Sequence, residues 1–124
     1  MVNSPRAAQS ATNSDTAYCP DRCDIIWIDF NPQTGREQAN RRPAFVLSPR
    51  SYNRVTRLCI LCPITSQIKG YPFEVELKSG STTGVILSDQ VKSLDWQQRR
   101  SDFIENNPDP FPEISGKLKA LLGL

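Results

Sequence analysis

Two polar stretches of the sequence carry the side chains best suited to chemistry. Residues 35–43 (GREQANRRP) combine one glutamate with three arginines, and residues 63–73 (PITSQIKGYPF) combine two neighbouring hydroxyls with a lysine and a tyrosine. A glutamate can accept a proton, an arginine fork can neutralise a phosphate, and a hydroxyl can hold an oxygen atom by a hydrogen bond. Each stretch alone is weak evidence of a site, because most polar loops are simply solvated.

The 124 residues include no histidine, which narrows the chemistry further. Serine–histidine triads, HExxH zinc proteases and nucleases that use a pair of histidines are excluded. A hydrolase of this composition would have to move protons with Asp, Glu, Lys, Cys, Tyr or Arg. Hydrophobic residues make up 38% and charged residues 23%, which is typical of a globular chain, and the length fits one domain.

The positive charge is concentrated in one part of the chain. Residues 36–57 hold six arginines and one glutamate, so this segment carries +5; since the formal net charge of the whole chain is +2, the remainder carries −3. The planar fork of arginine suits phosphate oxygens. The segment is either a solvated basic face or a groove for a nucleic-acid backbone, and charge alone does not decide between them.

The four cysteines raise the question of a zinc site, since Cys19 and Cys23 form one close pair and Cys59 and Cys62 another. The second pair argues against it. Cys59 and Cys62 lie within an apolar run, where a spacing of three residues directs the side chains to opposite faces of a strand. We therefore expect no metal site. Cys59 and Cys62 are interpreted as core residues, and Cys19 as an exposed residue at the edge of the domain.

The elements that must position these residues are short. β-Branched and apolar runs bounded by turn residues predict strands over residues 24–30, 43–47, 58–64, 73–77, 85–88 and 91–96. Pro63 indicates that the third of these ends at a sheet edge or a bulge. Pro112, Glu113 and leucines at helical spacing predict a C-terminal helix that ends at Gly123. The predicted fold class is mainly β, a small, strongly curved antiparallel sheet or barrel with a C-terminal helix.

The first part of the chain differs from the rest. Residues 1–18 are small, polar and without periodicity, so we expect a disordered leader followed by one domain over residues 19–124. No apolar run approaches the roughly 18 residues that span a bilayer, and the start lacks the apolar centre of a signal peptide. We expect a cytoplasmic protein without a membrane partner.

Several blocks of the domain carry a family resemblance when they are taken in order. The blocks are DIIWIDFNP (24–32), GxEQ (35–38), RPA (42–44), LSPxxYN (47–53), PxTS (63–66), KGYPFEV (69–75) and DQVKSLDW (89–96). Together they resemble the MazF/PemK family of endoribonuclease toxins. The similarity runs from Asp24 to the C-terminus, about four-fifths of the chain, and the joint order and spacing of the blocks make it specific.

The resemblance implies an SH3-like barrel of the CcdB/Kid/MazF type that works as a homodimer. It implies the toxin of a type II toxin–antitoxin system, which cuts single-stranded RNA (mRNA) at short sequences without a metal ion or another cofactor. The product ends would be a 2′,3′-cyclic phosphate, or the 3′-phosphate formed when it opens, and a 5′-hydroxyl. The implied protein partner is a cognate antitoxin with an acidic, partly disordered tail.

Three catalytic side chains follow from the resemblance, position by position. Arg42 would stabilise charge on the reacting phosphate, Thr65 would hold a phosphate oxygen, and Glu37 would either orient Arg42 or accept the proton of the 2′-hydroxyl. The bland alternatives are an exposed Glu37–Arg42 ion pair worth less than about 1 kcal/mol and hydroxyls that merely end a strand. Further RNA contacts are predicted from Ser66, Gln67, Lys69, Arg41, Asp89, Gln90 and Lys92.

The sequence departs from the family's pattern at three places. Some members carry a histidine in the loop that holds Arg36 and Arg41 here, so proton transfer assisted by histidine is excluded. The Kid/PemK branch has an arginine two residues before an aspartate, where this chain has Leu87 before Asp89, so an Arg–Asp catalytic pair is excluded there. Cys23 replaces the glycine that is usual before the first strand, a change that we expect to affect only the entry turn. Two rival functions stay open: a catalytically inactive module that binds RNA or antitoxin, and a gyrase-poisoning toxin of related fold.

Overall fold

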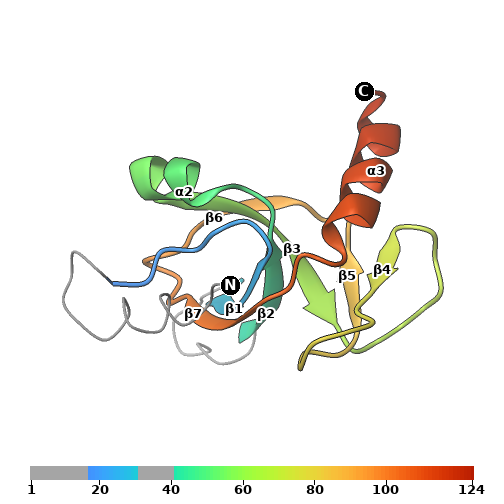
Figure 1. Ribbon diagram of the computed structural model, residues 1–124, viewed down its shortest axis with the longest axis horizontal. Helices are drawn as coiled ribbons and strands as arrows, with labels where there is room; N and C mark the ends of the chain where they lie inside the picture. Colours follow the sequence, from blue (N-terminus) through green and yellow to red (C-terminus); the bar gives the residue numbers. More distant parts are fainter. Residues whose placement is uncertain (1–16, 31–40) are drawn as a thin grey trace.

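The computed structural model describes residues 17–30 and 41–124. Glu37 and residues 1–16 of the expected leader lie outside the described residues. The elements in the described ranges, drawn in Figure 1, are β1 (Asp24–Asp29), β2 (Arg41–Val46), α2 (Arg50–Thr56), β3 (Leu58–Thr65), β4 (Glu74–Glu76), β5 (Val85–Leu87), β6 (Lys92–Asp95), β7 (Asp102–Asn106) and α3 (Phe111–Leu122). This architecture confirms the predicted mainly β class with a C-terminal helix.

The described strands form one antiparallel sheet in which β3 has the most partners. The strand order is β4-β5-β3-β2-β1-β7, and β6 pairs with β3 outside this path. β3 pairs with β2 along one side, and with β6 and then β5 along the other. Ala44 of β2 lies opposite Pro63 of β3, so the start of β2 is placed beside the end of β3. This register brings the two polar stretches of the sequence together.

Pro63 lies inside β3, near its end at Thr65, and faces a gap between two neighbouring strands, which acts as the local sheet edge that the proline predicted. The Leu47 N–H donates to the Ile60 carbonyl at 2.8 Å, and because bonded pairs alternate along an antiparallel ladder, the nitrogen of Pro63 points away from β2. On that other side, pairing with β6 ends at Leu61 and pairing with β5 begins at Ile64. Proline is tolerated there because its missing N–H falls in the gap between two partners.

The strands bury side chains on both faces of the sheet. Alternate residues of β1 contribute to two apolar clusters, Ile25 to one and Ile26 and Ile28 to the other. Cys62 belongs to the first cluster and Cys59 to the second, which confirms that both are core residues on opposite faces. Helix α3 covers the first cluster, which includes its Ile114.

The two ends of the strand order are joined by side chains. Glu105 of β7 accepts hydrogen bonds from the backbone N–H groups of Ser81 (3.0 Å) and Thr82 (3.1 Å), in the loop between β4 and β5. The amide of Asn107 donates to the carbonyl of Ser79 in the same loop at 3.0 Å. These contacts hold the curved sheet in a barrel-like shape without a ladder between β4 and β7.

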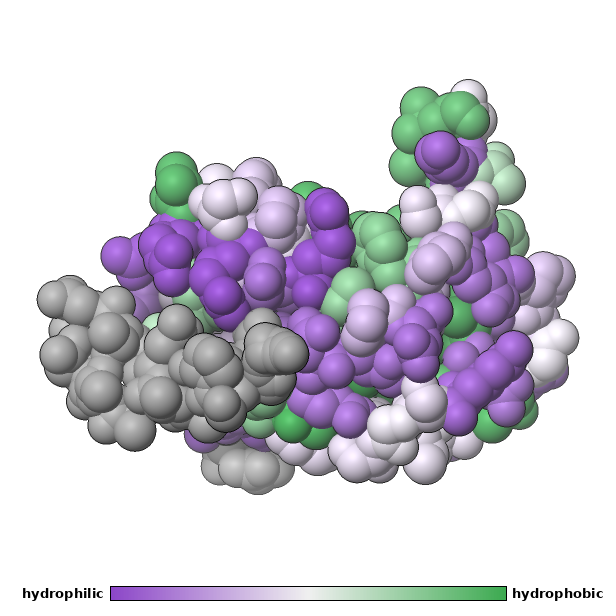
Figure 2. Space-filling model, in the orientation of Figure 1, coloured by the Kyte–Doolittle hydropathy of each residue, from purple (hydrophilic) through white to green (hydrophobic). Residues whose placement is uncertain are grey.

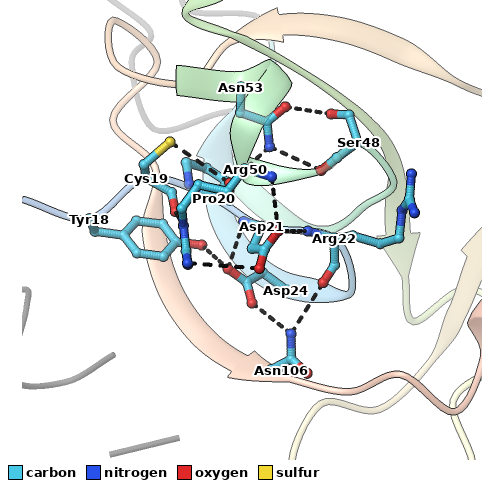
Figure 3. Close-up of polar contacts among 10 residues, drawn as sticks. All are labelled: Tyr18, Cys19, Pro20, Asp21, Arg22, Asp24, Ser48, Arg50, Asn53 and Asn106. Atoms are coloured by element: carbon cyan, nitrogen blue, oxygen red, sulfur yellow. Dashed lines mark hydrogen bonds and ion pairs between the residues drawn. The ribbon is translucent and has the colours of Figure 1, made fainter. Parts of the chain in front are cut away.

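The segment that precedes β1 is bonded to the rest of the domain by two buried polar side chains (Figure 3). The carboxylate of Asp24 accepts hydrogen bonds from the Tyr18 hydroxyl at 2.7 Å and from Asn106 of β7 at 2.9 Å. The amide of Asn53 in α2 donates to the Pro20 carbonyl at 2.8 Å and accepts from the Ser48 hydroxyl at 2.6 Å. Both acceptor and donor groups are satisfied, which offsets the desolvation of these buried polar groups.

These contacts correct two expectations for the first cysteine pair. Cys19 is buried, with 5% of its surface exposed, because its carbonyl accepts a hydrogen bond from Arg50 at 3.0 Å and the chain beside it is fixed to α2. Cys23 does more than alter the entry turn: its thiol is part of the first apolar cluster. Its φ of 74° lies in the left-handed region, where glycine carries no steric penalty.

The prediction from the sequence omitted two elements and assigned two residues to a loop instead of a strand. Helix α2 and strand β7 were not predicted. Arg41 and Arg42, expected in a loop, are the first two residues of β2, opposite Asp29 and Ile28 of β1. Pairing with a buried neighbouring strand has extended the ladder into a polar stretch, since backbone hydrogen bonds do not depend on side-chain polarity.

Helix α3 projects from the sheet, and its C-terminal end points away from the other elements (Figure 1). Apolar residues gather at this tip (Figure 2), where Leu121, Leu122 and Leu124 are exposed. In the described part of the chain, no helix is long and apolar enough to cross a membrane.

We predict that Gly116→Ala stabilises the protein. Gly116 lies in the interior of α3, and a Cβ built there meets no atom within 4 Å. Alanine should therefore raise the free energy of unfolding by about 0.5–1 kcal/mol, because it loses less backbone entropy in a helix. Urea unfolding of the two proteins measures the difference, and a less stable alanine variant with an unchanged slope would contradict it.

Candidate active site

A cleft of about 460 Å³ opens where β2 begins and β3 ends. It is lined by Arg41, Arg42, Pro43, Ile64, Thr65, Ser66, Gln67 and Thr83, and is called the Arg42 cleft below. Its residues come from both polar stretches of the sequence. Of the predicted site residues, the structure brings together Arg41, Arg42, Thr65, Ser66 and Gln67 at this one place.

Arg42 is the cation best placed to act in the cleft. Its guanidinium carbon lies 5.6 Å from the centroid of the Phe30 ring, a cation–π contact that limits where the side chain can point. Among the described residues, no carboxylate forms an ion pair with it. Its positive charge can therefore be used on an anion that enters the cleft.

Arg41 is held differently, because a buried carboxylate binds it. Asp29 is only 6% exposed at its side chain and accepts hydrogen bonds from Arg41 and from Arg100, both at 2.9 Å. Arg41 also bonds the exposed Asp102 at 2.6 Å. Burial raises the pKa of Asp29, but the hydrogen bonds and charges of Arg100 and Arg41 outweigh it and hold that pKa below its ordinary value. Asp29 thus stays ionised and keeps Arg41 in place at the cleft wall.

Thr65 ends β3 with its side chain fixed by the loop that follows. The Thr65 Oγ1 accepts a hydrogen bond from the backbone N–H of Gln67 at 3.1 Å. This local bond is the one expected of a hydroxyl that ends a strand. It uses the oxygen as an acceptor, so the hydroxyl proton can still be donated to a phosphate oxygen. The two interpretations of Thr65 are therefore compatible.

Thr83 and Gly84 shape the cleft, although sequence reasoning assigned them only to a turn. Gly84 has a φ of +118°, and a Cβ built on it would lie 2.4 Å from the carbonyl oxygen of Thr65. The backbone of the residue before β5 is therefore packed directly against the backbone of Thr65. A glycine that ends a Ser/Thr/Gly turn just before a strand was the available signal, since isolated glycines often mark close backbone approaches.

The remaining predicted RNA contacts lie outside the lining of the cleft. The loop that carries Lys69 is fixed by Glu74, which accepts the N–H of Lys69 at 2.9 Å and that of Gly70 at 2.8 Å. Asp89 accepts the hydroxyl of Tyr71 at 2.8 Å, and this hydrogen bond raises the pKa of Tyr71.

The last two predicted contacts are Gln90, in the turn between β5 and β6, and Lys92, the first residue of β6. Gln90 is exposed, and its backbone N–H donates to the Leu87 carbonyl at 3.1 Å. Lys92 lies opposite Leu61, four residues before Thr65 and so about 13 Å along the strand. Asp89, Gln90 and Lys92 are therefore exposed residues that do not line the cleft.

The cysteine thiols have raised pKa values, so none of them is suited to act as a nucleophile. Burial raises the pKa of Cys59 and of Cys62 to about 12, and that of Cys23 to about 11. These thiols are protonated at neutral pH, and the thiolate is the reactive form. In the described ranges, no group of three or more His, Cys, Asp or Glu residues is arranged to hold a metal ion.

Comparisons with known proteins point in one direction. The family of PemK-like, MazF-like toxins of type II toxin–antitoxin systems matches residues 21–122. The endoribonuclease toxin MazF of Escherichia coli (strain K12) is 47% identical over 107 residues, which cover 86% of this chain and 96% of that protein. The endoribonuclease PemK of Escherichia coli is 31% identical over 108 residues, 82% of this chain and 81% of that protein.

Solved structures give the same result for the fold. The crystal structure of MazF from Deinococcus radiodurans is similar with a TM-score of 0.77 at 50% identity, covering 86% of this chain and 99% of that one. A MazE–MazF structure from the same organism is similar with a TM-score of 0.74 at 45% identity, covering 86% of this chain and 98% of the other.

We predict that Gly84→Ala damages both stability and the cleft. The added Cβ would collide with the carbonyl of Thr65, so the end of β3 must shift, and the free energy of unfolding should fall by about 2 kcal/mol or more. Gly70→Ala is the matched control, because Gly70 also has a positive φ of +81° but nothing lies within 4 Å of its Cβ. Chemical unfolding of both variants checks this, and equal losses would show that the approach to Thr65 is unimportant.

We also predict that Asp29 makes the protein less stable in acid. Because its folded-state pKa lies below the ordinary value of about 3.9, its contribution is complete above that value and is lost as the pH falls through the folded-state pKa. Asp29→Asn should be less stable at neutral pH, since two arginines lose their carboxylate, and should lose less further stability on acidification. Urea unfolding over a pH series measures both, and equal acid slopes would exclude Asp29 as the cause.

Proposed function

The chain belongs to the family of PemK-like, MazF-like toxins of type II toxin–antitoxin systems, and we propose that the Arg42 cleft is where this endoribonuclease toxin cleaves single-stranded RNA. One observation carries the assignment of the site. Arg42 and Thr65, which come from separate polar stretches, line the same cleft. No described carboxylate pairs with Arg42, and the Thr65 hydroxyl can still donate its proton. A phosphodiester needs both a cation and a hydrogen-bond donor of this kind.

The chemistry suits these residues because RNA brings its own nucleophile. The 2′-hydroxyl oxygen attacks the adjacent phosphorus while the bond from phosphorus to the 5′-oxygen breaks. One proton leaves the 2′-hydroxyl and one reaches the 5′-oxygen, so the products are a 2′,3′-cyclic phosphate, which can open to a 3′-phosphate, and a 5′-hydroxyl. The protein has to align the two oxygens and stabilise the negative charge that grows on the phosphate.

Each site residue has a role in that scheme. Arg42 pairs with the non-bridging phosphate oxygens through its fork, and the Thr65 hydroxyl donates to one of them, assisted by Ser66. Glu37 either orients Arg42 or accepts the proton of the 2′-hydroxyl. The fixed Arg41 contributes charge at the cleft wall. We propose that no metal ion is required, because Arg42 and Thr65 supply the charge and the hydrogen bond that the reacting phosphate needs.

Base recognition is assigned to the exposed polar side chains around the cleft. Ser66 and Gln67 lie at its lining and are assigned to base edges, whereas Lys69, Asp89, Gln90 and Lys92 lie outside the lining and are assigned to flanking nucleotides. Single-stranded RNA is read in this way, through unstacked bases held by hydrogen bonds and stacking.

The proposed partners follow from the family. Solved relatives include MazE–MazF assemblies, and we assign to this chain a cognate antitoxin whose acidic, partly disordered tail neutralises the basic residues of the cleft. We further propose a homodimer as the working unit, acting in the cytoplasm, where its RNA substrate is found.

We predict that Arg42→Ala abolishes RNA cleavage while the protein remains folded. Purified protein is incubated with a long single-stranded RNA in EDTA, and the cuts and the chemistry of the 3′ ends are mapped. The wild type should give discrete cuts with cyclic or open 3′-phosphate ends, and loss of the arginine should slow cutting by about 100- to 1,000-fold. Arg42→Lys, which keeps the charge but loses the fork, should fall between the two.

Lys78→Ala serves as the control, because Lys78 is exposed and is not among the residues that line the cleft. Intact RNA with the wild-type protein would favour an inactive RNA- or antitoxin-binding module. Intact RNA together with stalled DNA replication would favour a gyrase-poisoning toxin. Cutting that requires a divalent ion would overturn the metal-independent scheme.

A further inference from the structure

A second pocket, of about 450 Å³, lies beside helix α2 and the turn that follows β6. Its lining includes Tyr18, Arg54, Arg57, Trp96, Gln97 and Arg100, and we call it the Arg54 pocket. Three of these are arginines, and among the described residues none of those that line the pocket is acidic. Asp29 binds Arg100, so the charge that the pocket offers comes mainly from Arg54 and Arg57.

Two of the three arginines hold unfavourable backbone conformations. Arg57 has a φ of 65° and Arg100 a φ of 56°, and within the described ranges Cys23 is the one other non-glycine residue with a positive φ. A side chain in the left-handed region costs about 1–2 kcal/mol, which a glycine would avoid. At Arg57 this conformation ends helix α2, and the Arg57 N–H donates to the Asn53 carbonyl at 2.9 Å. A glycine would serve that backbone turn at lower cost, but both positions carry a guanidinium that lines the pocket.

A carboxylate connects this pocket to the reaction cleft. Asp29 accepts hydrogen bonds from Arg100, which lines the Arg54 pocket, and from Arg41, which lines the Arg42 cleft, each at 2.9 Å. Both arginines are thus fixed by the same buried group. A chain that carries a phosphate at regular intervals can contact the cleft and the pocket together.

The pocket also offers an aromatic surface. The indole N–H of Trp96 donates to the Asn53 carbonyl at 2.9 Å, which fixes the ring at the pocket wall. Arg57 bonds the side chain of Gln97 beside it. Forked cations next to a fixed indole are the combination that holds a nucleotide, the phosphate by charge and the base by stacking. An acidic peptide would use the charges but not the indole face.

We propose that the Arg54 pocket binds a nucleotide of the single-stranded RNA that lies beyond the linkage cleaved in the Arg42 cleft. Affinity then depends on RNA that extends past the cleaved sequence. The inference rests on the proposed function, because it assigns the position of the pocket's ligand relative to the cleaved bond. It assigns Arg54 and Arg57 to phosphate contacts and Trp96 to base stacking.

The test uses a variant that removes charge without damaging the fold. In the double variant Arg54→Gln/Arg57→Gly, glycine relieves the left-handed backbone of Arg57, so thermal unfolding should occur at or above the wild-type temperature. The matched control, Lys78→Gln/Lys119→Gln, removes two exposed charges elsewhere. Binding is measured on RNA with 2′-O-methyl groups, which lack the nucleophile and cannot be cut.

Fluorescence anisotropy compares a long single-stranded RNA with a short oligonucleotide that spans only the Arg42 cleft. For the long RNA, the double variant should bind about ten- to thirtyfold more weakly at 0.1 M salt, and the slope of log K against log salt should fall by about 1.4, or about 0.7 for each lost phosphate contact. The ratio of long- to short-RNA affinity should fall in this variant and stay constant in the control.

Several results would overturn the proposal. These are an unchanged affinity for long RNA, an equal loss for long and short RNA, and an equal loss in the lysine control. Lost binding of poly-glutamate with RNA binding retained would assign the pocket to an acidic protein segment instead. Because binding is read on uncleavable RNA, failure of the wild type to cut unmodified RNA would refute the proposed function separately.

Discussion

The structure depends on strand β3, which forms backbone hydrogen bonds with three other strands. It pairs with β2 on one side, and on the other side it must change from β6 to β5. Pro63 occupies the point of change, where a backbone N–H would have no strand to bond. The residues just after this point enter the new pairing and then end the strand, so Thr65 is fixed by β5 and by Gly84. The position of the proposed catalytic hydroxyl is thus a consequence of the sheet's topology.

The second constraint is electrostatic and centres on Asp29. A carboxylate that is nearly fully buried requires compensation, and Arg41 and Arg100 supply it from β2 and from the turn after β6. The same arrangement removes Arg41 from the set of free cations and leaves Arg42, which lines the same cleft, to meet a substrate phosphate. Two successive arginines therefore have different roles, because Asp29 and Asp102 bind Arg41, whereas no described carboxylate binds Arg42.

The sequence could predict what depends on local pattern. β1 was recognisable from its β-branched and aromatic run, and α3 from Pro112 at its start and Gly123 at its end. Helix α2 was not, because its seven residues lack a side-chain cap and are held by tertiary bonds to Asn53. The order of the family's blocks indicated Arg42 and Thr65, whereas Thr83 and Asp29 belong to the site only through strand register and burial.

A basic segment of sequence need not fold into one basic surface. Arg41 is neutralised by two aspartates, and Arg50 bonds the Cys19 carbonyl and Asp21, so neither contributes fully to the external field. Of the other described arginines of this segment, Arg42 lines the cleft, and Arg54 and Arg57 line the Arg54 pocket. With a net charge of only +2 and a Debye length of about 8 Å in physiological salt, long-range attraction of RNA is weak. Binding must then rely on forked, short-range contacts, which require arginines held in place, as Arg41 is by Asp29 and Arg42 by the Phe30 ring.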